Sequence, residues 1–98
     1  MADHLSQALI LANKDFNLEI HSSEVTTTED FQKVLANVIQ HLLDKDFERL
    51  INGLYRIDVS EEKVKLAIAS GEDIAEKVAS LIIEREMQKV VTREKYRG

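Results

Sequence analysis

Apolar residues recur every three or four positions along most of the chain, a spacing that places them on one face of a helix. The first such face lies within residues 5–12, and Asp3 is placed to cap the helix that carries it. The helical spacing ends near residue 13, and Phe16, Leu18 and Ile20 then alternate with polar residues. We therefore predict a short first helix and an extended segment within residues 14–25, for which we favour an arm lying across the helices over a strand.

A wide apolar stripe from Phe31 to Leu43 predicts a second helix. Thr26 and Thr27 each stand three residues before an acid, which is the spacing of a capping box. The stripe can be continued to residue 54, but one helix of about 29 residues would be about 43 Å long, more than a compact domain of this size spans. Since aspartate is a good cap residue, we predict a bend or break at Asp44 or Asp46.

The Asn52–Gly53 pair is typical of a turn, yet the apolar spacing continues across it without a change of phase. We therefore place Gly53 inside a helix, at a cost of about 0.5–1 kcal/mol relative to alanine, and expect another helix to approach its backbone closely. The stripe stops soon afterwards. We predict a joint between two helices from Arg56 to Ser60, with Asp58 or Ser60 capping the second helix.

The C-terminal third of the chain predicts two more helices. One contains Val64, Ala67 and Ile68 and is closed by Gly71, and Ser70 with Asp73 has the spacing to open the next. The last helix is expected from about residue 72 to about residue 95. Its apolar face is wider than one neighbour could cover, which favours either a central position in the fold or a seam between two copies of the chain.

Composition fits this picture. The chain has 98 residues, 44% of them apolar and 32% charged, with no proline and no cysteine. We expect a single all-α domain over residues 1–98, a small bundle of four or five helices. Residues 1–25 would form a partly extended N-terminal arm with a short helix, and residues 26–98 the helical core. No stretch approaches the ~20 apolar residues of a membrane span, and the N-terminal segment lacks a basic leader, so we expect a cytoplasmic protein.

Charge is unevenly distributed. The net charge is −5, but residues 85–98 are mainly basic, whereas residues 1–30 carry six acids and one lysine. The basic end suits the C-terminal dipole of a helix. It is also a possible contact surface for an acidic partner, for the acidic end of a second copy or for a nucleic-acid backbone, formed by Arg85, Lys89, Arg93, Lys95 and Arg97.

The sequence holds no catalytic set, phosphate-binding glycine loop or calcium loop. His41, Asp44 and Glu48 would share one face of an unbroken helix, but we interpret them as a solvated polar face and expect no metal and no cofactor. The segment "LAIASGEDIAEKVAS" has the glycine spacing of a DNA-binding helix-turn-helix. Lys77 and Ser80 occupy its apolar positions and acids open its second helix, so we do not expect sequence-specific DNA binding.

Tyr55, Arg56 and Asp58 are the candidate contact residues at the predicted joint. Our favoured interpretation is structural: a cap and an ion pair fix the joint, and the Tyr55 ring lies in the core with its hydroxyl at the rim. The alternative is a site that contacts a ligand or partner through these three residues.

Two stretches, "DFERLINGLYRIDVSEEKV" (46–64) and "IAEKVASLIIEREMQKVVTREKYR" (74–97), resemble small bacterial all-helical proteins. The most specific piece is "LYRIDVSEEK", at the helix junction. The resemblance implies a bacterial cytoplasmic setting and attaches no activity to any residue.

The function that we expect is a non-enzymatic protein-interaction or regulatory module. It would be a homo-oligomer, with a dimer favoured, and an unidentified protein partner is also possible. One alternative is nucleic-acid binding through the basic C-terminal helix. Another is a small-ligand or enzyme site at the junction from Tyr55 to Asp58.

Overall fold

The computed structural model describes residues 3–96, which form an all-α bundle, as the periodicity predicts. A single 3-10 turn, η1, accompanies the helices, and no strand occurs in this part of the chain. No helix among these residues is long and apolar enough to cross a membrane. The helices are α1 (His4–Phe16), α2 (Thr28–Lys45), α3 (Phe47–Ile57), α4 (Glu61–Ala69) and α5 (Ile74–Lys95), and η1 spans Ser22–Glu24.

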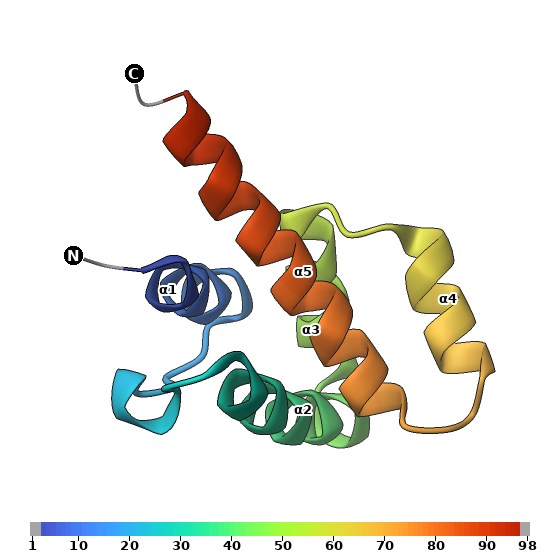
Figure 1. Cartoon of the computed structure of the whole chain (residues 1–98). Helices are drawn as coiled ribbons and strands as arrows, with labels where there is room; N and C mark the ends of the chain where they lie inside the picture. The colour runs from blue at the N-terminus through green and yellow to red at the C-terminus, as the bar shows by residue number, and fades with distance from the viewer. Residues whose placement is uncertain (1–2, 97–98) are drawn as a thin grey trace.

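Helix α5 is the central element of the bundle. It crosses the molecule diagonally in Figure 1 and packs against α1, α2, α3 and α4. The wide apolar face of this helix predicted either a central position in the fold or a seam between two copies, and the structure shows the central position. Helix α4 lies to the right of α5 in Figure 1, apart from α1 and α2, and packs chiefly on α5. One side of α4 is consequently covered by only a few contacts.

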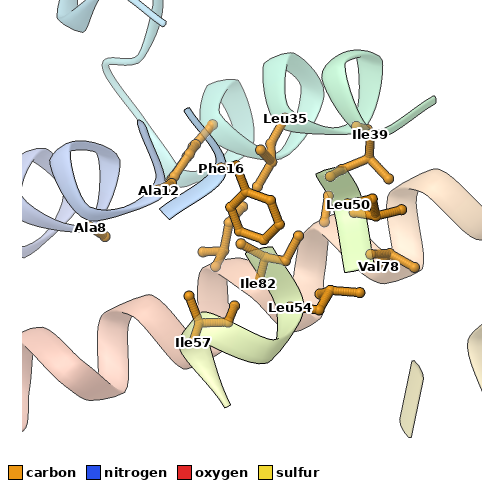
Figure 2. Packing of buried hydrophobic residues seen from close by; sticks show 14 of the residues in the cluster. Ala8, Ala12, Phe16, Leu35, Ile39, Leu50, Leu54, Ile57, Val78 and Ile82 are labelled. Atoms are coloured by element: carbon orange, nitrogen blue, oxygen red, sulfur yellow. The ribbon is translucent and has the colours of Figure 1, made fainter. Parts of the chain in front are cut away.

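The core is built around the ring of Phe16, which projects from the end of α1 towards α3 and α5 (Figure 2). Gly53 lies inside α3, as predicted, and the Phe16 ring occupies the space where a Gly53 side chain would be. The expected close approach is thus made by an aromatic side chain of another helix. Leu50, Leu54 and Ile57 continue the buried face of α3 on either side of Gly53.

The N-terminal segment is more helical than its pattern indicated. Asp3 caps α1, accepting a hydrogen bond from the Ser6 N–H at 2.7 Å, but α1 continues to Phe16. The chain is extended only after Asn17, and the Asn13 amide takes the place of a strand partner there. Its Nδ2 donates to the Ile20 carbonyl at 2.9 Å, and its Oδ1 accepts from the Ile20 N–H at 3.1 Å.

The predicted helix break is confirmed at Asp46, which ends α2 and begins α3. Its N–H donates to the Leu42 carbonyl at 2.9 Å, while its carboxylate accepts from the Arg49 N–H at 3.3 Å. The capping spacing before α2 is also confirmed: Thr27 Oγ1 accepts from the Asp30 N–H at 3.0 Å. Hydrogen bonds from Thr26 hold the pKa of the Asp30 carboxyl below its usual value.

The predicted cap formed by Ser70 and Asp73 is wrong. The Ser70 hydroxyl instead donates to the Ala67 carbonyl at 2.7 Å, so this residue belongs to the end of α4. Gly71 and Asp73 both have positive φ, of 69° and 50°, and Asp73 makes no side-chain cap to α5. The turn between α4 and α5 is thus set by two left-handed residues and needs no capping box.

Candidate functional site

The joint between α3 and α4 is built by two caps that serve different helices. Asp58 ends α3 in the left-handed conformation, at φ 56°, and its N–H donates to the last carbonyls of α3. Ser60 begins α4, because its Oγ accepts from the Lys63 N–H at 3.3 Å. Of the two caps considered for α4, Ser60 is therefore the one present.

Two of the predicted basic residues meet this joint. Arg85 Nε donates to the Ile57 carbonyl at 2.8 Å, and Lys89 Nζ donates to the Arg56 carbonyl at 3.4 Å. Both cations lie at the C-terminal end of α3, where free carbonyls and the helix dipole favour positive charge. The structure therefore brings together part of the basic surface and the candidate junction, which the sequence treated as separate sites.

The remaining basic residues lie farther along α5. Arg93 and Lys95 are exposed in its last turn. Arg97, which belonged to the same predicted surface, lies outside the described residues. The basic residues that the structure describes thus divide into two that support the joint and two that face solvent.

The three candidate junction residues do not form one site. Tyr55 and Asp58 line a shallow hollow of about 340 Å³ that also touches Ser60 and Glu61. Arg56 lies elsewhere, beside the end of α1, where its Nη1 donates to the Asp15 carbonyl at 3.4 Å. The expectation that the Tyr55 ring lies in the core is wrong: the residue is 68% exposed, and its hydroxyl lies 3.4 Å from Glu61 Oε1.

An apolar groove runs between α3 and α4 next to the joint. Its volume is about 220 Å³, and Tyr55 and Ile68, which is 40% exposed, stand at its edges. Only two charged side chains border it, Glu61 and Lys65, both on α4. The full lining is Ile51, Leu54, Tyr55, Val59, Glu61, Val64, Lys65 and Ile68. Such a surface suits an apolar side chain from another helix.

A second, polar hollow lies on the other side of the joint, against α5, with a volume of about 310 Å³. Its charged side chains balance: Asp58 and Glu84 are acidic, and Lys63 and Arg85 are basic. Arg85 already donates a hydrogen bond to the Ile57 carbonyl, so only part of its guanidinium group is available to a ligand. This hollow has no preference of charge that would point to one class of ligand.

The histidine and acids considered for a metal site lie on two helices, since α2 ends between Asp44 and Glu48. Across residues 3–96, no three His, Cys, Asp or Glu side chains are placed to hold a metal ion together. His41, Asp44 and Glu48 are all exposed, as a solvated polar face would be.

Sequence reasoning missed one residue near Arg85 and Lys89, the two cations at the joint between α3 and α4. Glu86 is fully buried in the middle of α5, and neither carboxylate oxygen has a hydrogen-bond partner among the described residues. Burial, and after it the neighbouring Asp15 side chain, raises the pKa of Glu86 to about 8, whereas the charges of Lys89 and Arg85 lower it. The available signal was position, because Glu86 stands four residues after Ile82 and four before Val90 on the apolar stripe.

No protein-family model matches the chain, and no curated protein or solved structure shows significant similarity to it.

Proposed function

We propose that the protein is a non-enzymatic interaction module that self-associates through the apolar groove between α3 and α4. The single observation that carries this proposal is the open apolar groove itself, with Tyr55 68% exposed and Ile68 40% exposed at its edges. Burial of apolar surface is the main favourable term in protein association, and exposed aromatic side chains are common anchors of interfaces.

The charges that border the groove make a second copy the occupant that fits. Glu61 and Lys65 stand four residues apart on α4. If two α4 helices pair antiparallel about a two-fold axis, Glu61 of one copy faces Lys65 of the other, and both pairs form at once. The same arrangement brings Ile68 over the Val59 end of the opposite groove. A surface complementary to itself is what a two-fold dimer requires.

The association should be weak and concentration-dependent. A groove of about 220 Å³ accepts only a few side chains from each partner, and small interfaces bind weakly. We expect dimer formation with a dissociation constant on the order of 10–1000 µM. Sedimentation velocity or light scattering from low micromolar to about millimolar protein measures this; a monomer throughout that range would overturn the proposal.

Variants on α4 test whether the groove forms the interface. Ile68→Asp places a charge on the groove and should abolish self-association. Leu66→Asp is the matched control, because Leu66 is 66% exposed on the same helix but does not line the groove. Equal loss in both variants would contradict the groove as the contact.

A charge exchange tests the pairing of the two copies. Glu61→Lys should weaken the dimer, since two lysines then face each other across the interface. The double variant Glu61→Lys with Lys65→Glu should restore it, because opposite charges meet again. A dimer that is weakened by the single variant and not restored by the double variant would rule out the antiparallel pairing. A protein that stays monomeric but captures an apolar helical peptide in the groove would assign the groove to a different partner.

A further inference from the structure

Glu86 of α5 and Asp15 of α1 are two acids on helices that pack against each other, and the Asp15 side chain raises the pKa of Glu86. Glu86 is 0% exposed, and both of its carboxylate oxygens lack hydrogen-bond partners among residues 3–96. Asp15 Oδ2, on the facing helix, is likewise buried without a partner in the described structure. Two ionised carboxylates can only accept hydrogen bonds and repel each other, so this arrangement leaves both groups unsatisfied.

The cations nearby do not remove the problem, because they are turned towards backbone carbonyls. On α5, Arg85 Nε donates to Ile57 O at 2.8 Å and Lys89 Nζ to Arg56 O at 3.4 Å. On α3, Arg56 Nη1 donates to the carbonyl, and not the carboxylate, of Asp15 at 3.4 Å. One proton on Glu86 would supply the missing donor, since its O–H can then donate to Asp15.

We propose that a proton on Glu86, donated to Asp15, makes these two residues a proton-linked latch that holds α1 against α5. With the proton in place, the pair has one donor and one fewer negative charge, and α1 stays seated. When α1 lifts, Glu86 meets water and loses its proton. The lifted helix uncovers apolar side chains that are otherwise buried, namely Ala8, Leu9, Ala12 and Phe16.

The direction of the pH dependence follows from the two states. In the closed state burial raises the pKa of Glu86 to about 8, whereas the usual value of 4.5 applies once the residue is exposed. Below about pH 4.5 both states carry the proton, so opening does not depend on pH. Between about pH 4.5 and 8 opening releases the proton and becomes easier as pH rises, by up to about tenfold per pH unit. Above about pH 8 both states are ionised and the dependence ends.

A second titratable contact joins the same two helices and must be separated from this pair. His4 Nε2 lies 2.8 Å from Glu94 Oε2, so the start of α1 is tied to the end of α5 by an exposed contact. Imidazole also changes charge between pH 5 and 8. The variant His4→Gln removes this contribution and leaves the buried pair intact.

Amide hydrogen exchange of the full chain from about pH 5 to 9, corrected for the intrinsic exchange rate, tests the latch. In α1 the opening constant should rise up to about tenfold per pH unit below pH 8 and then level off. In Glu86→Gln this rise should vanish, because the amide donates to Asp15 at every pH. In His4→Gln it should remain. A rise that survives in Glu86→Gln would overturn the proposal, and so would an opening constant of α1 equal to that of α2 at every pH, because α1 would then open only when the whole protein unfolds.

A measurement without a variant keeps the proposal testable if Glu86→Gln does not fold. Carbon-detected NMR follows the side-chain carboxyl of Glu86 in the folded wild-type protein directly. A midpoint near 8 supports a proton held on Glu86 in the closed state. A midpoint near 4.5, the usual value for glutamate, would overturn it.

Discussion

The ring of Phe16 fills the position that a side chain on Gly53 would occupy. A Cβ built on Gly53 would lie 2.1 Å from Cδ1 of Phe16, far inside any permitted contact. Phe16 is 1% exposed, and it lies at the end of α1 among core residues from three other helices (Figure 2). Helices α1 and α3 therefore meet through a ring that packs directly on the backbone of Gly53.

Gly53→Ala should consequently destabilise the protein. In an unobstructed helix interior the change would stabilise by about 0.5–1 kcal/mol. Here the added methyl group overpacks the core, and we expect a net loss of about 1–3 kcal/mol in the free energy of unfolding, measured by urea denaturation. Asn52→Ala, at an exposed neighbouring position, is the control and should change stability by less than about 0.5 kcal/mol.

A double-mutant cycle identifies Phe16 as the cause. Phe16→Leu removes the ring that the alanine would strike, so Gly53→Ala should cost less in that background than in the wild type. If Gly53→Ala costs the same in both backgrounds, or stabilises the wild type, the ring is not what requires glycine at this position.

Asp46→Ala should lower the free energy of unfolding by about 1 kcal/mol, because it removes the side-chain cap of α3. The Asp46 carboxylate accepts from the Arg49 N–H at 3.3 Å, and this residue separates α2 from α3. Asp44→Ala is a matched control, because Asp44 is exposed and carries the same charge. Among the described residues, its carboxylate accepts hydrogen bonds from the Gln40 side chain and caps no helix. Equal losses in the two variants would show that charge, and not capping, sets the cost.

The helices and the break at Asp46 could be predicted because each is encoded locally. Apolar spacing gives the face of a helix, and the side chains of Thr27 and Asp46 satisfy free N–H groups within three residues. The helical spacing of apolar residues continues across Asn52 and Gly53, and it correctly predicted a continuous helix there, although this dipeptide alone is typical of a turn.

Several features that depend on contacts between distant parts of the chain could not be predicted. The alternation from Phe16 to Ile20 is the same whether Phe16 is helical or extended, and the deciding contact is with Gly53, far along the chain. Glu86 of α5 is buried where Asp15, far away in the sequence on α1, raises its pKa. The groove at Tyr55 exists because α4 packs on α5 and only weakly on α3, which no local pattern records.

Asp58→Ala should destabilise the protein, whereas Asp58→Gly should not. Asp58 has φ 56°, a conformation that glycine adopts without cost and that alanine resists by about 1 kcal/mol or more. We expect Asp58→Gly to equal or exceed the wild type in melting temperature, and Asp58→Ala to melt several degrees lower. If both variants lose the same amount, the Asp58 carboxylate contributes a contact of its own, and the interpretation of this residue as a backbone cap of α3 fails.

Arg85→Met tests whether the basic residues nearest the joint are structural. Arg85 Nε donates to the Ile57 carbonyl at 2.8 Å from a partly buried position, so the variant leaves a carbonyl at the end of α3 without this donor. We expect the free energy of unfolding to fall by about 1–2 kcal/mol. The measurement is made at about pH 6, where Glu86 is protonated in the folded protein, so the loss of the Arg85 charge does not change the stability through an ion pair with Glu86. Arg93→Met, at an exposed position of α5, should lose less than about 0.5 kcal/mol. If Arg85→Met is as stable as Arg93→Met, the hydrogen bond from Arg85 to the end of α3 contributes nothing measurable to stability. Both arginines are then available for a contact surface on α5. Binding of mixed-sequence nucleic acid at low salt, weakened in both variants, would then identify that surface as electrostatic.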